Sequence, residues 1–162
     1  MKKLKMKLIV KSVNEVTTQS PPEESHVIVS IFTPGRTDKF ADLKPITNNH
    51  TKKLIRLGFH DLDRMPKKGS AAEEVFGPIV LFNKNMADEI IKITKNVEIV
   101  IVHCDAGQSR SPAVAAALSK FYNGDDSIYF SSGSMYGLPR YTPNMLVYKI
   151  LLERLHEKQG NS

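Results

Sequence analysis

The sequence predicts an α/β fold, with a mostly parallel central sheet of about four or five strands flanked by helices, in a single domain over residues 1–162. Two largely apolar runs, 26–32 and 98–103, are typical of buried strands. Segments with apolar residues at three- and four-residue spacing alternate with such runs, as expected of helices that cover a sheet. A chain of 162 residues is long enough for one well-buried core and short for two.

The other elements are predicted from periodicity and from proline, glycine and asparagine. In chain order we expect a strand at 6–17, a loop at 18–25, strands at 26–32 and 53–61, a loop excursion at 62–77, a helix at 78–95, a strand at 98–103, a helix at 110–122, a loop with a short strand at 127–130, and a last helix from Pro143 or Asn144. Pro78 suits a first helical turn. In the last helix one apolar face is expected to contain Leu146, Ile150, Leu151 and Leu155.

Composition narrows the classes of function. The net charge of +6 favours anionic partners, but the lysines are scattered and do not alternate with aromatic residues, so nucleic acid is the less favoured partner without being ruled out. A single cysteine excludes an internal disulfide and a Cys-rich metal site, and it suits the cytoplasm. The first ten residues are too weakly apolar for a signal peptide, and no stretch approaches the roughly 18 apolar residues of a membrane span. We expect a cytoplasmic protein without a membrane segment.

One stretch, IVIVHCDAGQSRSP at 99–112, carries the chemistry. A strand leads into Cys104, a short polar loop follows, and a helix begins near Arg110. Backbone N–H groups of Asp105, Ala106, Gly107, Gln108 and Ser109 can form an anion-binding nest together with the helix N-terminus. Arg110 can hold two oxygens of a phosphoryl group at once, and the same positive field favours Cys104 as a thiolate nucleophile. We expect His103 to orient the loop and help stabilise the thiolate, and Ser111 to donate a hydrogen bond to the sulfur.

The segment HCDAGQSRS resembles the His-Cys-x5-Arg-Ser/Thr active-site signature of the cysteine-dependent protein tyrosine phosphatases, and most of all their compact dual-specificity branch. The resemblance implies a phosphatase-like fold, with Cys104 as nucleophile, Arg110 as phosphate binder and an upstream aspartate as general acid. It implies no cofactor and no metal. The candidates for the acid are Asp61 and Asp63, and we favour Asp61 because it directly follows the predicted strand.

Two alternative roles are considered for several basic and polar residues near these positions. Arg64, Lys67 and Lys68 in the excursion, and Arg140 in the later loop, either hold an anionic substrate or form solvated basic loops. Asn144 is expected to cap the last helix.

The favoured function is hydrolysis of phosphomonoesters, as a protein-tyrosine or dual-specificity phosphatase that acts on a phosphorylated protein or peptide through a phosphocysteine. One alternative is an RNA 5′-phosphatase, which would use the same loop and the basic charge. Another is a phosphate-binding module without catalytic activity. The sequence indicates no oligomeric state.

Overall fold

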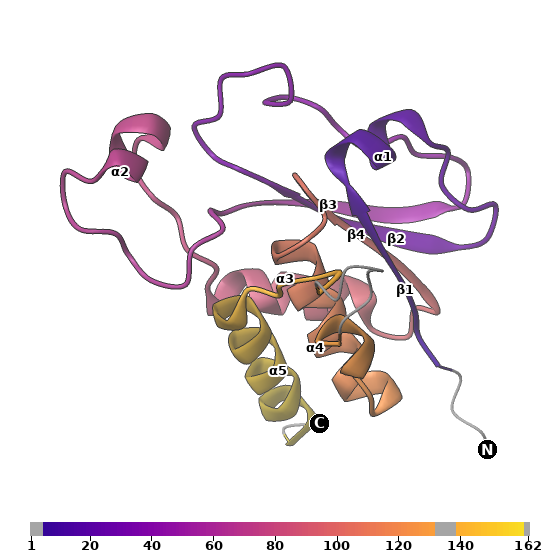
Figure 1. Ribbon diagram of the computed structural model, residues 1–162. Helices are drawn as coiled ribbons and strands as arrows, with labels where there is room; N and C mark the ends of the chain where they lie inside the picture. Colours follow the sequence, from indigo (N-terminus) through magenta and orange to yellow (C-terminus); the bar gives the residue numbers. More distant parts are fainter. Residues whose placement is uncertain (1–4, 132–138, 161–162) are drawn as a thin grey trace.

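The computed structural model describes residues 5–131 and 139–160, and their framework is one four-stranded parallel sheet (Figure 1). Its strands are β1 (Lys7–Ser12), β2 (His26–Phe32), β3 (Thr51–Gly58) and β4 (Ile99–Cys104), arranged in the order β1-β4-β2-β3. All three strand pairings are parallel. The expected α/β class and parallel sheet are therefore confirmed. Because β4 lies between β1 and β2, Cys104 ends an interior strand.

The helices are α1 (Val13–Thr18), α2 (Ala71–Phe76), α3 (Lys84–Thr94), α4 (Arg110–Asn123) and α5 (Met145–Gly160), with a 3-10 turn, η1 (Ser127–Tyr129). Helices α3, α4 and α5 cover one face of the sheet, whereas α1 packs on the other (Figure 1). Successive strand residues alternate between the two faces because of the β pleat. In β4, for example, Val100 and Val102 face the three helices, and Ile101 faces α1.

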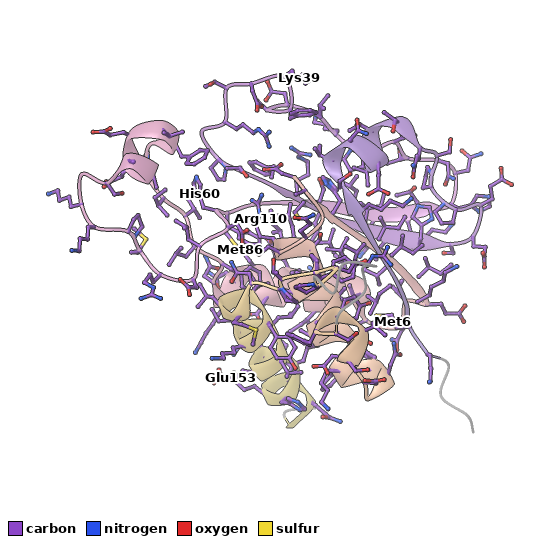
Figure 2. The ribbon with its side chains drawn as sticks, viewed as in Figure 1. Met6, Lys39, His60, Met86, Arg110 and Glu153 are labelled. Atoms are coloured by element: carbon purple, nitrogen blue, oxygen red, sulfur yellow. The ribbon has the colours of Figure 1, made fainter. Side chains whose placement is uncertain are left out.

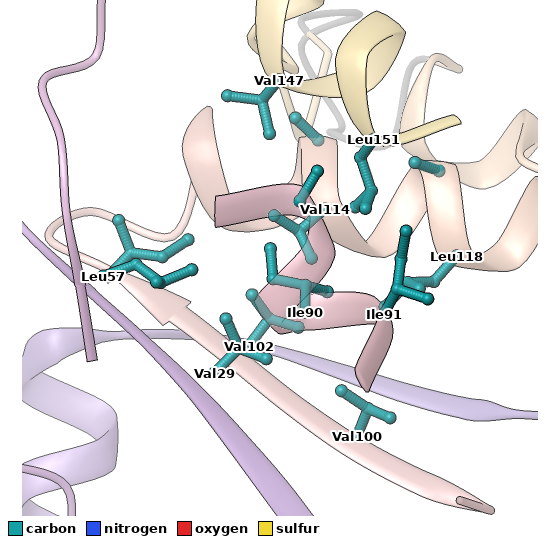
Figure 3. Packing of buried hydrophobic residues seen from close by; sticks show 14 of the residues in the cluster. Val29, Leu57, Ile90, Ile91, Val100, Val102, Val114, Leu118, Val147 and Leu151 are labelled. Atoms are coloured by element: carbon teal, nitrogen blue, oxygen red, sulfur yellow. The ribbon is translucent and has the colours of Figure 1, made fainter. Parts of the chain in front are cut away.

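The main core lies between the sheet and the three helices. Val29 and Val102 of the sheet, Ile90 of α3, Val114 of α4 and Leu151 of α5 are completely buried together (Figure 3). Burial of each such side chain contributes on the order of 2 kcal/mol. This core fixes the end of β4 against the start of α4, where the candidate site lies.

The predicted first strand at 6–17 is wrong in its second half. β1 ends at Ser12, and α1 begins at Val13. Ser12 and Glu15 form a capping box, in which the Ser12 side chain accepts from the Glu15 N–H and the Glu15 carboxylate accepts from the Ser12 N–H. These two bonds satisfy helix-end donors, and they outweigh the β-propensity of the neighbouring valines.

The predicted helix at 78–95 begins six residues later than expected. Asn83 is the N-cap and accepts a hydrogen bond from the Met86 N–H, so α3 begins at Lys84. The preceding residues are held outside a helix because the Val80 backbone exchanges hydrogen bonds with His60. Pro78 therefore does not start this helix.

Three smaller predictions also differ from the structure. The excursion at 62–77 contains helix α2, capped by Ser70, and the predicted strand at 127–130 is the 3-10 turn η1. β3 ends at Gly58 rather than 61, because its partner β2 ends at Phe32 and no strand continues beside it. The predicted loop before the last helix includes 132–138, which lie outside the described residues.

The predicted helices at 110–122 and after Asn144 are confirmed. On α5, Leu151 and Leu155 are buried as expected. Val147 takes the third buried position, because Leu146 and Ile150 are only partly covered.

Candidate active site

The carboxyl end of β4 delivers Cys104 to a tight loop, and α4 begins at Arg110 directly after it. The cysteine is free of a disulfide and 3% exposed. The loop turns at Gly107, whose φ of 72° is one that side chains disfavour. A Cβ atom at this position would lie 3.0 Å from the backbone of Lys11. Both the turn and the close approach to β1 therefore require glycine here.

Three groups surround the Cys104 sulfur. Ser111 Oγ lies 3.1 Å from Sγ, and the backbone N–H groups of Gly107 and Ser111 donate to Sγ at 3.3 and 3.4 Å. Hydrogen-bond donors of this kind stabilise negative charge on sulfur, and so does the N-terminal end of α4. The structure thus brings the predicted nucleophile and the predicted Ser111 together, with the sulfur at the focus of the loop.

Arg110, which is labelled in Figure 2, is 5% exposed. Its Nη1 donates to the Phe59 carbonyl at 2.7 Å, and its Nη2 donates to Asp105 Oδ2 at 2.9 Å. A guanidinium group has five N–H donors, so these two bonds, made within the described part of the chain, leave three for a phosphoryl group. Arg110 is held in place by the protein and still able to bind an anion.

Asp105, the residue after the cysteine, links the loop to two arginines. Its Oδ2 accepts from Thr33 Oγ1 at 2.5 Å and forms ion pairs with Arg36 Nη1 at 2.8 Å and Arg110 Nη2 at 2.9 Å. Burial by itself would raise the pKa of Asp105, but the Thr33 hydrogen bond and the charges of Arg110 and Arg36 outweigh it and lower this pKa below its usual value. Asp105 is therefore ionised at neutral pH and takes part of the charge of Arg110.

His103 lies behind the loop and contacts its backbone. Ser30 Oγ lies 2.6 Å from Nε2, and the Cys104 carbonyl lies 3.3 Å from Nδ1. Arg56 donates to Ser30 Oγ at 3.1 Å. A tautomer with its proton on Nδ1 satisfies all three contacts: Arg56 donates to Ser30, Ser30 donates to Nε2, and Nδ1 donates to the carbonyl.

Burial lowers the pKa of His103 to about 4, against a smaller opposing effect of the Cys104 carbonyl, so the ring is neutral at pH 7. The expected orienting role agrees with this geometry. The expected help to the thiolate does not come from a positive charge on the ring, because the ring carries none. Any such help would act through the backbone, where His103 contacts the Cys104 carbonyl.

Asp61 stands over the loop, although it lies three residues past the end of β3. Its Oδ1 accepts from Ser109 Oγ at 2.7 Å and from Asn144 Nδ2 at 2.9 Å. Asn144 also caps α5, since its Oδ1 accepts from the N–H groups of Leu146 and Val147. Two donors from different segments thus hold Oδ1 of this exposed carboxyl group.

The alternative acid, Asp63, is directed elsewhere. It is 61% exposed and pairs with Arg64, which is 85% exposed. Lys67 and Lys68 are exposed on the same excursion. Arg140 stacks on the ring of Tyr141. In the described part of the chain, none of these five residues forms a side-chain hydrogen bond or an ion pair with the loop.

Backbone bonds from distant segments support the loop. The N–H groups of Val13, Thr142 and Asn144 donate to the carbonyls of residues 105, 108 and 109 respectively, at 3.1, 2.8 and 3.0 Å. Ala106 and Gln108, both predicted to line the phosphate site, are exposed. The loop is thus fixed from the β1–α1 corner and from the segment before α5.

Sequence reasoning did not identify Thr33, Arg36, Ser30 and Arg56 as part of the site. Only Ser30 had a local signal, because it is a polar residue inside the apolar run HVIVSIF. The arginines and Thr33 come from segments whose positions depend on the sheet order. Within residues 5–131 and 139–160, no group of three or more His, Cys, Asp or Glu side chains could hold a metal ion. Among the same residues, no helix is long and apolar enough to cross a membrane.

Comparisons with known proteins give structural similarity alone. No family model matches the sequence, and no curated protein shows significant sequence similarity to it. Among solved structures, human DUSP28 aligns with a TM-score of 0.49 at 14% identity, over 96% of this chain and 95% of that one. A human tyrosine phosphatase-like serine/threonine/tyrosine-interacting protein aligns with a TM-score of 0.49 at 18% identity, over 95% of this chain and 91% of that one.

A third structure, of PTPMT1 in complex with PI(5)P, aligns with a TM-score of 0.47 at 13% identity, over 96% of this chain and 94% of the other. The second of these neighbours is tyrosine phosphatase-like by name. The identities and TM-scores of the three neighbours are too low to transfer an activity. The function is therefore argued from the side chains of the site.

Proposed function

We propose that this protein hydrolyses phosphomonoesters through a phosphocysteine, as a protein-tyrosine or dual-specificity phosphatase. The observation that carries the proposal is the setting of the Cys104 sulfur. Two backbone N–H groups and the Ser111 hydroxyl lie within 3.1–3.4 Å of it, and Arg110 follows at the start of α4. A nucleophile and an anion receptor held in one loop suit attack on a bound phosphoryl group.

In the first step, the Cys104 thiolate attacks phosphorus. The S–P bond forms as the P–O bond to the leaving group breaks, while Arg110 and the loop amides stabilise the charge on the three other phosphoryl oxygens. The leaving oxygen takes a proton from Asp61, whose position over the loop is supported by its bonds from Ser109 and Asn144.

In the second step, water attacks the phosphocysteine. Asp61, now a carboxylate, accepts a proton from this water, the P–O bond to water forms, and the S–P bond breaks. The electron pair returns to sulfur, and Ser111 Oγ, 3.1 Å away, can donate a hydrogen bond to the departing thiolate. Inorganic phosphate leaves, and the enzyme returns to its starting state.

The test is hydrolysis of p-nitrophenyl phosphate in the presence of EDTA, together with acid quenching and mass spectrometry of the intact protein. We expect turnover, inhibition by vanadate, and a mass increase of one phosphoryl group that Cys104→Ser removes along with turnover. Undiminished turnover by the Cys104→Ser protein would refute the mechanism. Release of phosphate from triphosphorylated RNA, at a higher kcat/KM than from phosphopeptides, would instead indicate the RNA 5′-phosphatase.

A further inference from the structure

A groove of about 390 Å³ opens beside the phosphate loop, between the segment after β2 and the end of α2. The residues of its wall that matter here are Thr33, Arg36, Asp38, Val75, Phe76 and Asp105. The two sides approach each other closely, because a Cβ atom on Gly35 would lie within 2.0 Å of the Phe76 carbonyl oxygen. Since Asp105 belongs both to the groove and to the loop, the groove adjoins the place where a phosphoryl group would bind.

The charges of the groove compensate one another. Arg36 lies between two carboxylates, with Nε 2.6 Å from Asp38 Oδ1 and Nη1 2.8 Å from Asp105 Oδ2. The Asp105 carboxylate also pairs with Arg110 at 2.9 Å. With Arg110 included, two cationic side chains are therefore balanced by the two anionic side chains of Asp38 and Asp105. An incoming carboxylate or second phosphate would meet Asp38 and Asp105, while the guanidinium of Arg36 is already engaged by both.

The opposite wall of the groove is apolar. Val75, on α2, is 67% exposed and lines the groove. The half-buried Phe76 lies next to it and packs against His60 at a ring distance of 5.3 Å. An apolar side chain in the groove would cover Val75 and part of Phe76, whereas an acidic one would lose hydration without gaining a free cation.

We propose that this groove receives the substrate residue next to the phosphorylated residue, and that Asp38 and Arg36 are specificity-determining residues that make it select an apolar neighbour over an acidic one. The inference rests on the proposed function and names its substrate class: a phosphorylated peptide with apolar flanking residues. It does not depend on Asp38 or Arg36 touching the reacting atoms.

The experiment compares two phosphotyrosine peptides that are identical except that both flanking residues are Leu in one and Glu in the other. For the wild type we expect kcat/KM to be about tenfold higher for the Leu peptide, the order expected for one nearby carboxylate repulsion in partly screened surroundings. Asp38→Asn should reduce this ratio to about threefold or less. Arg36→Gln should increase it, because it removes the cation and leaves both carboxylates.

Asp42→Asn is the matched control, since it removes one exposed carboxylate from the same segment away from the groove and should leave the ratio unchanged. A ratio near one in the wild type, a preference for the Glu peptide, or an equal ratio in wild type, Asp38→Asn and Arg36→Gln would overturn the inference. Because each protein is its own reference, a general loss of turnover in a variant does not change the ratio.

The same two peptides, titrated against the Cys104→Ser protein, separate this inference from the proposed function. Tighter binding of the Leu peptide without hydrolysis of either peptide by the wild type would overturn the proposed function and leave the groove assignment standing. Hydrolysis without selective binding or selective turnover would overturn the groove assignment and leave the proposed function standing.

Discussion

The phosphate loop and the segment that carries Asp61 lie against each other, yet they are held in different ways. The loop joins a buried strand to a buried helix, and three distant backbone N–H groups bind its carbonyls. Asp61 is exposed, and among residues 5–131 and 139–160 its carboxyl group is held by the side chains of Ser109 and Asn144. The proposed nucleophile and the proposed anion receptor thus belong to the stable core, whereas the proposed acid is attached to its edge. Substitutions in the loop should lower both the free energy of unfolding and the activity, whereas substitution of the proposed acid should lower the activity alone.

The largest combined effect is expected from Gly107→Ala. A side chain would have to adopt a φ of 72° and would press on the Lys11 backbone at 3.0 Å, so we expect a loss of about 2–3 kcal/mol in the free energy of unfolding and about 100-fold in kcat/KM. Urea unfolding and p-nitrophenyl phosphate hydrolysis measure the two. Gly69→Ala is the control, because Gly69 has a similar φ of 81° and nothing within 4 Å of a Cβ atom. Equal losses in both variants would mean that the contact with β1 does not matter.

Asp61→Asn should lower kcat by about 100-fold while leaving the free energy of unfolding unchanged, because the residue is exposed and the amide can keep one hydrogen bond. Steady-state kinetics on an aryl phosphate, with urea unfolding alongside, provides the check. The effect should shrink for substrates with good leaving groups, which need less proton transfer. A larger kcat loss in Asp63→Asn than in Asp61→Asn would move the acid to Asp63.

Asn144→Ser should lower kcat by about tenfold. Serine retains the ability to cap α5 but is too short to replace the 2.9 Å bond to Asp61, so helix stability should change by less than about 0.5 kcal/mol. Combining this change with Asp61→Asn tests the connection. Since Asn144 acts through Asp61, the double variant should be no slower than Asp61→Asn alone. Multiplicative losses would contradict a positioning role for Asn144.

The last prediction concerns the pH dependence of stability that His103 causes. It has the smallest expected effect on activity at neutral pH. The folded-state pKa is about 4, below the usual value of 6.5, so the unfolded chain takes up a proton first as the pH falls. As the pH falls from 6.5 to 4, this residue should therefore lower the free energy of unfolding by up to about 3 kcal/mol, with no further loss below pH 4. The difference in unfolding free energy between the wild type and His103→Gln, measured across this range, isolates the contribution. A constant difference would mean that His103 is protonated in the fold.

Short-range patterns determined much of this molecule. The apolar runs of β2 and β4, the helical periodicity of α4 and α5, and the order of strand, loop and helix around Cys104 all follow from hydrophobic burial and chain geometry that a local window contains. Where two local signals favoured different structures, the intrinsic propensity of the residues gave the wrong prediction. The capping box of Ser12 and Glu15 converted the end of a β-branched run into α1, and the N-cap at Asn83 displaced the start of α3 from Pro78.

The sequence by itself determined the contents of the phosphate loop, because cysteine, glycine and arginine at these spacings already place the proposed anion receptor around the proposed nucleophile within one segment. Only the tertiary structure decided what surrounds it. Asp61 stands over the loop because Ser109 and Asn144, from two other segments, bind it. Asp105 is shared between Arg36 and Arg110 because β2 lies beside β4 in the sheet. Apart from the pair of Asp105 and Arg110, these contacts join residues separated by tens of positions, and their partners are set by the tertiary arrangement rather than by any local pattern.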